Sequence, residues 1–132
     1  MVTNRGTMRW KIFDGVLNAR ILIDFMKRLA KDADRKVCLI LDNLWPHHSK
    51  PVKEWLAKHH DDIEVFCLPS YSPDLNPDEM ANADPKQAVT KLAPARTKLR
   101  LVEATARHLR SEQRQPERIM RYVEHDPVRY AA

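Results

Sequence analysis

The sequence predicts an α/β fold built around a mostly parallel sheet. Residues 37–43 (VCLILDN) form an unbroken apolar run that ends on Asp42 and Asn43. A run without alternation and with β-branched members is typical of a strand buried on both faces. A helical pattern precedes this run and a second apolar run follows at residues 63–68. This alternation of helices and strands is typical of α/β proteins.

The size and composition fit one globular domain. The chain has 132 residues, of which 43% are hydrophobic and 31% are charged, and this allows a buried core. No apolar run approaches the roughly 20 residues that span a bilayer, and the N-terminus lacks the apolar segment of a signal peptide. Cys38 and Cys67 each lie inside an apolar run, so we expect buried, reduced thiols and a cytoplasmic protein.

The positive charge is concentrated in the last third of the chain. Residues 1–90 carry 13 Lys and Arg and 13 Asp and Glu, whereas residues 91–132 carry 10 against 5. A basic end on a neutral body favours a polyanionic partner. The composition is equally consistent with a solvated helical face.

The N-terminal residues predict a hairpin followed by a helix. Residues 7–13 alternate between apolar and basic side chains, as an antiparallel or edge strand with one wet face does. The turn sequence at residues 4–6 makes residues 1–3 the tail of a preceding strand. Asn18 is expected to cap a helix that runs to about Lys31. Its apolar face comprises Leu17, Ile21, Leu22, Phe25 and Leu29.

A second helix is expected between the two apolar runs. Ser49 fits its N-cap, and Pro51 fits its first turn. Its inward-facing residues are expected to be Val52, Trp55 and Leu56. The strand at residues 63–68 should then pair in parallel with the strand at residues 37–43.

The remaining sequence predicts three more helices. Asn76 and Pro77 suit the start of a helix to about Thr90, which the proline-containing segment 91–96 breaks. Thr97 suits the cap of a long basic helix through about Arg114, and residues 116–125 form a last short helix. The buried side of the long helix is expected to comprise Leu99, Val102, Ala106 and Leu109.

Two carboxylates stand out as candidate metal ligands. Asp42 ends the first strand, and Glu79 lies in the first turn of the helix after the second strand. The C-terminal ends of neighbouring parallel strands lie at the same edge of a sheet, so the two side chains can converge. Converging carboxylates suit Mg²⁺ or Mn²⁺, which take oxygen ligands and can hold a phosphodiester for in-line attack.

Structural roles also fit these carboxylates. Asn76 and Glu79 have the spacing of a capping box, in which Glu79 returns to the backbone of residue 76. Spacing alone favours this cap over metal binding. Asp42 with Asn43 likewise fits the start of a turn.

The neighbouring loops contain histidines and aromatic residues that could have structural or ligand-binding roles. His47 and His48 lack the spacing of a zinc site, which leaves loop surface or contacts to phosphate. Trp45 and Tyr71 could stack on nucleic-acid bases. Packing under the loop is the favoured role for both aromatic residues.

Two blocks of sequence resemble a known family. LILDNLWPHHSKPVKEWL and IEVFCLPSYSPDLNPDE are similar to the catalytic domain of bacterial insertion-sequence transposases related to the Tc1/mariner group, in the DDE superfamily. In that family the acid ending the LDN strand and the Glu closing the LNP-x-E pattern belong to a metal-binding triad. The resemblance therefore assigns metal binding and catalysis to Asp42 and Glu79. His47 and Ser49 match family loop positions. Pro46 departs from the family pattern, in which the proline is expected one residue earlier.

The resemblance implies an RNase H-like (ribonuclease H-like) fold, which is a five-stranded mixed sheet with flanking helices. Residues 1–90 would form a partial catalytic core, and residues 91–132 a basic helical extension of the same domain. The family's first catalytic Asp lies on a first, central strand, which this sequence is expected to lack. The acids upstream of Asp42 are poor replacements, because they lie in a turn, a helix or a connector: Asp14, Asp24, Asp32 and Asp34.

The resemblance implies the C-terminal part of a DDE transposase. Its reaction is hydrolysis at transposon ends, dependent on Mg²⁺ or Mn²⁺, followed by strand transfer. DNA is the expected partner in a cytoplasmic, nucleoid-associated protein, with no membrane and no small-molecule substrate. The residues expected at the DNA are His47, Ser49, Lys50, Arg96, Lys98, Arg100, Arg107, Arg110 and Arg114.

The expected absence of the first strand has consequences for activity and for assembly. A two-carboxylate site should bind metal weakly, so the chain alone is expected to be inactive. Unpaired apolar strand edges favour a homodimer or pairing with a separately encoded N-terminal transposase fragment. The alternative function is a catalytically dead remnant that binds DNA or full-length transposase and modulates it, and a nuclease or resolvase of the same fold is a third reading.

Overall fold

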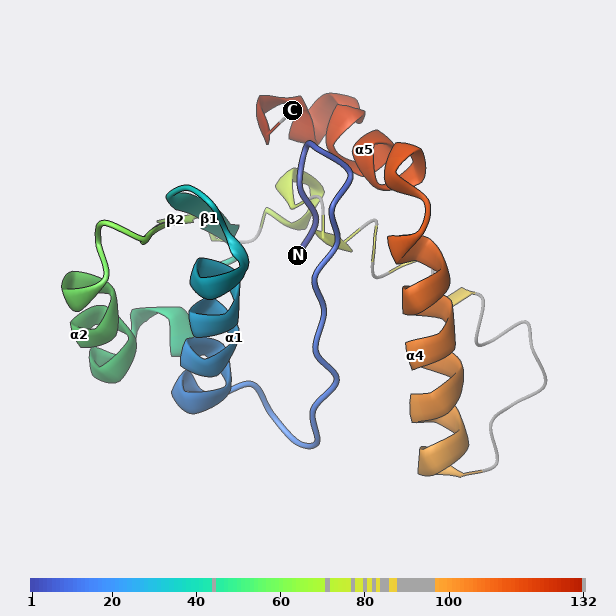
Figure 1. Cartoon of the computed structure of the whole chain (residues 1–132), viewed down its shortest axis with the longest axis horizontal. Coiled ribbons are helices and arrows are strands. Elements are labelled where there is room, and N and C mark those ends of the chain that lie inside the picture. The colour runs from blue at the N-terminus through green and yellow to red at the C-terminus, as the bar shows by residue number, and fades with distance from the viewer. Residues whose placement is uncertain are drawn as a thin grey trace. The chain divides into compact units, whose positions relative to one another are not determined.

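The computed structural model describes residues 1–43, 45–70, 72–76, 78, 79, 81, 83, 86, 87 and 97–131. Helices and strands alternate from Ala19 to Cys67, as in an α/β fold, and the described elements that follow are helical (Figure 1). The chain divides into two compact units, of which unit 1 comprises Met1–Ile12 and Pro73–Ala132 and unit 2 comprises Phe13–Ser72. The mixture of helices with parallel strands is compatible with an RNase H-like domain. Among the described residues, no helix has the length and apolar character needed to cross a bilayer.

The helices of unit 2 begin where their caps predict. Helix α1 spans Ala19–Asp32, and the Asn18 side chain accepts a hydrogen bond from the Ile21 amide at 3.0 Å. Its buried residues are Leu22, Met26 and Leu29, so the predicted apolar face is confirmed in its centre and gains Met26. Helix α2 spans Lys50–Lys58 with Ser49 at its N-cap and a proline in its first turn. Val52 is buried there, and Trp55 and Leu56 are half-buried.

The sheet of unit 2 consists of two parallel strands among the described residues. Strand β1 spans Val37–Leu41 and strand β2 spans Ile63–Cys67, with Leu39 opposite Val65 and Leu41 opposite Cys67. The predicted parallel pairing is therefore confirmed. Paired residues share a face of a sheet, and Leu39 with Ile63 marks the buried face.

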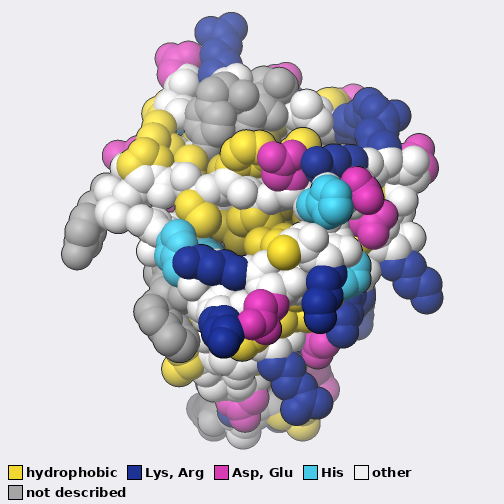
Figure 2. Space-filling view, turned by 90° about the vertical axis from the view of Figure 1, so that its left-hand side faces the viewer, with side chains coloured by type: hydrophobic (Ala, Val, Ile, Leu, Met, Phe, Trp, Pro, Cys, Tyr) yellow, Lys and Arg dark blue, Asp and Glu magenta, His cyan; other side chains and the backbone are white. Residues whose placement is uncertain are grey.

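The expectation that β1 is buried on both faces is wrong. Cys38, Glu64 and Phe66 lie on the face opposite Leu39, and all three are exposed, Phe66 by 50%. Cys67 is exposed as well, so the prediction of buried thiols also fails. Figure 2, which faces the side that carries α2, shows apolar side chains open to solvent among Lys, Arg and His. Burial depends on what covers each face, and the apolar run alone does not specify this.

Unit 1 begins with the predicted hairpin. Val2 and Met8 form an antiparallel bridge, and the Thr3 amide donates to the Thr7 carbonyl at 2.9 Å. Gly6 turns the chain with φ of 73°, and a Cβ at this residue would lie 2.5 Å from the Pro116 oxygen. Among the described residues the pairing is limited to this one bridge. The strand expected at residues 7–13 is therefore not formed beyond Met8.

The C-terminal helices of unit 1 supply the core that receives the hairpin. Helix α4 spans Lys98–Gln113 and begins at Thr97, whose side chain accepts from the Arg100 amide at 3.3 Å. Helix α5 spans Pro116–Glu124, and a 3-10 helix, η3, covers Asp126–Ala131. The buried cluster comprises Met8, Ala81, Leu109, Ile119 and Tyr122, with Val2 and Trp10 partly buried against it.

The predicted buried side of α4 is only partly correct. Leu109 is buried and Val102 and Ala106 are half-buried, but Leu99 is 68% exposed. Only the C-terminal half of α4 reaches the buried cluster, so an apolar residue in the first turn stays open. The predicted helix end at Thr90 and the break at residues 91–96 lie outside the described residues.

Candidate functional site

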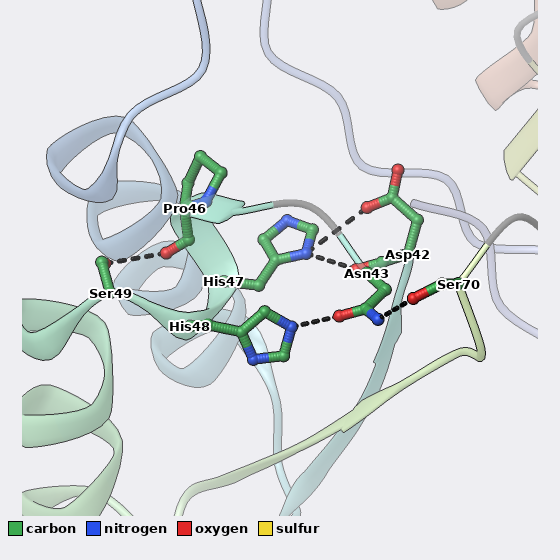
Figure 3. A network of polar contacts seen from close by, with 7 residues as sticks. All are labelled: Asp42, Asn43, Pro46, His47, His48, Ser49 and Ser70. Atoms are coloured by element: carbon green, nitrogen blue, oxygen red, sulfur yellow. Dashed lines mark hydrogen bonds and ion pairs between the residues drawn. The ribbon is translucent and has the colours of Figure 1, made fainter.

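Asp42 follows the last residue of β1, where the backbone leaves the sheet. The buried His47 ring contacts it twice: Nδ1 donates to the Asp42 backbone oxygen at 2.5 Å and lies 3.4 Å from Oδ1 of the carboxylate. The Asp42 side chain is 43% exposed, whereas that of His47 is 3% exposed. The other carboxylate oxygen points away from the network (Figure 3). The site therefore presents one carboxylate with one oxygen near a buried histidine and the other directed away from it.

Asn43 extends this network to the loop after β2. Its Oδ1 accepts a hydrogen bond from His48 Nε2, and its Nδ2 donates to the Ser70 hydroxyl at 2.6 Å. The short 3-10 helix η1 (Trp45–His48) places each histidine five residues after its partner. The loops at the C-terminal ends of β1 and β2 are thereby joined by side chains (Figure 3).

Two of the three DNA contacts expected in this loop are turned inward. His47 and Ser49 are 6% and 8% exposed, and the Ser49 hydroxyl donates to the Pro46 oxygen at 2.8 Å. Lys50 lies on the surface, with its amine 3.8 Å from Glu54. His47 and Ser49 thus make hydrogen bonds within the loop, Lys50 is exposed, and the DNA contacts expected of all three stay predictions.

Cys67 is a neighbour of the site that the sequence reasoning missed. Partial burial within the strand raises the pKa of its thiol, and the negative charge of Asp42 raises this pKa further. The thiol therefore stays protonated at neutral pH and is a poor nucleophile. The strand register reveals this neighbour, because Cys67 pairs with Leu41, the residue before Asp42.

Glu79 lies in unit 1, just after the cap formed by Asn76. A short 3-10 helix, η2 (Pro73–Leu75), leads into Asn76. The Asn76 side chain accepts from the Asp78 amide at 3.0 Å, and the Glu79 amide donates to the Asn76 backbone oxygen at 3.0 Å. Within the described residues, no hydrogen bond links the exposed Glu79 carboxylate to residue 76, so the reciprocal half of a capping box is not formed.

The donor atoms suit a hard divalent cation. Asp42 and Glu79 offer exposed carboxylate oxygens, the ligand type that Mg²⁺ and Mn²⁺ prefer. Asp42 belongs to unit 2 and Glu79 to unit 1. Three His, Cys, Asp or Glu side chains do not gather into a metal site anywhere in the part of the chain that the structure describes.

The predicted basic contacts of the last third lie on α4. Lys98, Arg100, Arg107 and Arg110 are exposed on this helix, and Arg114 is exposed at its C-cap. The Arg110 guanidinium lies over the Trp10 ring, 6.0 Å from its centroid. Arg96 and Tyr71 lie outside the described residues.

A buried carboxylate on α4 was not foreseen from the sequence. Glu112 is 0% exposed, and the Tyr122 hydroxyl donates to it at 3.0 Å. His108 Nε2 and an Arg118 nitrogen lie 3.4 and 3.7 Å from the same oxygen. The available signal was spacing: Glu112 follows the buried Leu109 by three residues, which puts both on one side of a helix.

Comparison with known proteins agrees with these motifs. Residues 1–102 match the family model described as DDE superfamily endonuclease. The match includes Asp42, Glu79 and the first turn of α4. No curated protein sequence matches the chain.

Proposed function

The chain belongs to the DDE superfamily endonuclease family, and from this premise we propose that it acts as part of a transposase of the bacterial insertion-sequence group related to Tc1/mariner. Membership in the family implies a transposase-like nuclease function. The proposed reaction is metal-dependent hydrolysis at transposon ends, followed by strand transfer from the freed 3′-hydroxyl. The proposed fold is RNase H-like, and the proposed location is the nucleoid.

One observation carries this proposal: Asp42 follows the C-terminal end of β1, with the buried His47 ring hydrogen-bonded to its backbone oxygen and 3.4 Å from its carboxylate. The C-terminal ends of parallel strands are where open α/β sheets place their chemistry. An exposed surface Asp has no need of such support. A carboxylate that must receive a cation in fixed geometry benefits from it, because a neighbour that orients a ligand strengthens metal binding.

Asp42 and Glu79 are the proposed catalytic metal ligands, with Mg²⁺ or Mn²⁺ as the ion. When bound, the ion would polarise the scissile phosphate and the attacking hydroxyl. His47 Nδ1 lies 3.4 Å from Asp42 Oδ1, and the second carboxylate oxygen points away from the ring (Figure 3). The hydrogen bond from Asn43 to Ser70 joins the loops that follow β1 and β2.

The unpaired edges of the two-stranded sheet support the proposal that this chain pairs with another chain. Within the described residues, β1 and β2 pair only with each other, so each strand leaves one edge unpaired. Unpaired edges are templates for another strand. We therefore retain a homodimer, or pairing with a separately encoded N-terminal transposase fragment, as the proposed assembly, which light scattering during gel filtration would measure.

The test is nicking of supercoiled plasmid with Mn²⁺. Samples are the chain alone and the chain joined to a preceding segment that supplies the first Asp predicted by the resemblance. Each is compared with its Asp42→Asn and Glu79→Gln variants. Glu54→Gln is the matched control, because Glu54 is an exposed acid on α2.

The expected result is nicking that both site variants abolish and the control retains. Equal nicking by Glu79→Gln and the unaltered protein would assign the activity to a contaminant. Absence of nicking in every folded sample would overturn the catalytic proposal. It would favour the second candidate, a DNA-binding or transposase-binding protein that modulates a full-length enzyme, for which the exposed arginines of α4 are the supporting observation.

A further inference from the structure

Asp42 lies between two hydrogen bonds that join the ends of β1 and β2. Before it, the Leu68 amide donates to the Leu41 backbone oxygen at 2.7 Å. After it, the Asn43 side-chain amide donates to the Ser70 hydroxyl at 2.6 Å. Asn43 and Ser70 each lie two residues beyond the partners of the first bond, and groups on one side of a strand recur every two residues. The side-chain bond therefore continues the pairing of the two strands one step past their last backbone bond.

The backbone pairing of the two strands stops before Asp42. Residues 42–43 and 69–70 belong to the described part of the chain, and within that part no backbone hydrogen bond joins the two segments. Backbone bonds fix a strand only as far as they extend, because each unpaired peptide keeps its rotational freedom. The position of Asp42 relative to the loop after β2 therefore depends on Asn43 and Ser70.

His48 determines which way the Asn43 amide faces. Its Nε2 donates to Asn43 Oδ1, so that Nδ2 is turned toward Ser70. A flipped amide would bring two N–H donors together, because an amide nitrogen donates and does not accept. The three side chains form one continuous row from η1 to the loop after β2 (Figure 3). We call His48, Asn43 and Ser70 the loop clamp.

The loop clamp lies on the surface, and this bears on its purpose. All three residues are exposed. Water competes for exposed hydrogen bonds, so their net contribution to the stability of a fold is small. A row of linked polar side chains from two loops is therefore better explained by local order than by stability. Local order is what a metal ligand requires of its neighbours.

We propose that the loop clamp positions Asp42, so that the affinity of this site for Mn²⁺ or Mg²⁺ depends on side chains other than the ligands. The proposal rests on the proposed function in taking Asp42 as a metal ligand. Asn43 directly follows Asp42, so a restrained Asn43 limits the rotation of the peptide between them. His47 holds the Asp42 backbone oxygen from within the same loop, whereas the clamp ties that loop to the neighbouring strand. The members of the clamp are thus positioning residues.

The test is NMR spectroscopy of the ¹⁵N-labelled full chain during a titration with Mn²⁺, whose unpaired electrons broaden the signals of nearby amides. The measured quantity is the Mn²⁺ concentration that halves the amide signals of residues 41–43. Ser70→Thr and Ser70→Val have nearly the same shape and differ in one hydroxyl, so they isolate the hydrogen bond. Ser111→Ala is the control, because it removes an exposed hydroxyl from α4. Circular dichroism melting confirms that each variant is folded.

Ser70→Val should require about three- to tenfold more Mn²⁺ than the unaltered chain. Ser70→Thr and Ser111→Ala should match the unaltered chain. His48→Ala should weaken binding as Ser70→Val does, and His48→Gln, which keeps an N–H donor, should restore it. Equal affinities of Ser70→Thr and Ser70→Val would overturn the clamp.

A second readout needs no metal. The ¹⁵N relaxation of the Asn43 amide reports its motion on the picosecond to nanosecond timescale. In the metal-free chain, its order parameter should fall in Ser70→Val and stay unchanged in Ser70→Thr. An order parameter that is equal in the two variants would overturn the clamp even where the metal affinities differ.

Asp42→Asn separates this proposal from the proposed function. Undiminished broadening of residues 41–43 in Asp42→Asn would refute Asp42 as a metal ligand, and it would overturn both proposals. Broadening that Asp42→Asn abolishes but Ser70→Val leaves unchanged would refute the clamp alone. Broadening that both variants weaken, in a protein that nicks no DNA, would refute the catalytic proposal and support the clamp.

Discussion

The Tyr122 hydroxyl on α5 donates a hydrogen bond to the buried Glu112 carboxylate on α4, with 3.0 Å between the oxygens. Charged side chains are almost never fully buried unless they are paired, and Glu112 is 0% exposed. Arg118 and His108 contact the same carboxylate oxygen. The contact therefore joins two helices through a charge that the core of unit 1 must keep compensated.

Replacing Tyr122 with Phe should destabilise unit 1. The ring stays in the core, but a buried carboxylate loses a hydrogen bond, which costs about 1.5–3 kcal/mol of unfolding free energy. Urea denaturation followed by circular dichroism measures this loss. Glu117→Gln on the exposed side of α5 is the control and should change the free energy by less than about 0.5 kcal/mol. Equal stability of Tyr122→Phe and the control would contradict the role given to the hydroxyl.

Replacing Gly6 with Ala should be more costly than replacing Gly15 with Ala. Both glycines have positive φ, 73° and 85°, so each substitution forces a strained backbone, at about 1 kcal/mol. An added Cβ at Gly6 also meets Pro116 backbone atoms, whereas Gly15 has open space. Thermal melting should show a larger shift for Gly6→Ala. Equal shifts would mean that the hairpin moves off α5 without cost.

Replacing His47 with Ala should weaken the Asp42 site without unfolding the protein. Residues that orient a metal ligand typically contribute about 10–100-fold to metal affinity or activity. In the chain joined to the preceding segment described above, the Mn²⁺ concentration for half-maximal nicking should rise by about tenfold or more. His60→Ala, an exposed histidine after α2, should leave that concentration unchanged. A change only in melting temperature would make the role of His47 purely structural.

Replacing Asp42 with Asn should make Cys67 more reactive. The negative charge of Asp42 contributes to the raised pKa of the Cys67 thiol, so its removal lowers that pKa and increases the thiolate fraction at a given pH. In a Cys38→Ser background, alkylation by iodoacetamide at pH 8 should therefore be faster in Asp42→Asn. Glu64→Gln is the control, because Glu64 lies on the opposite face of the sheet. An unchanged rate in Asp42→Asn would show that the two groups do not interact.

Local signals predicted the elements well. Asn18, Ser49 and Thr97 each precede an apolar pattern of helical spacing, and each is the N-cap of a helix. The apolar runs around Leu39 and Val65 predicted two strands and their parallel pairing. Such features are decided within a few residues, so sequence spacing is sufficient for them.

Burial was harder to predict, because it depends on segments far apart in the chain. Phe66 and Leu99 are apolar but exposed, since no described element covers them, whereas the charged Glu112 is enclosed. The site shows the same limit. The sequence identified Asp42 as a strand-end acid, but it did not reveal that His47 turns inward to hold it, because a five-residue return through a 3-10 helix has no simple periodicity.

Unit 1 joins the first residues of the chain to the last. The hydrogen bond between Gln113 and Met8 links positions 105 residues apart. A ribosome adding about 5–20 residues per second releases the hairpin roughly 5–20 seconds before α4 is complete. During that interval Met8 and Trp10 lack the side chains of α4 and α5 against which they pack, whereas all of residues 13–72 have been synthesised. The nascent chain can therefore fold residues 13–72 before the hairpin docks on α4 and α5.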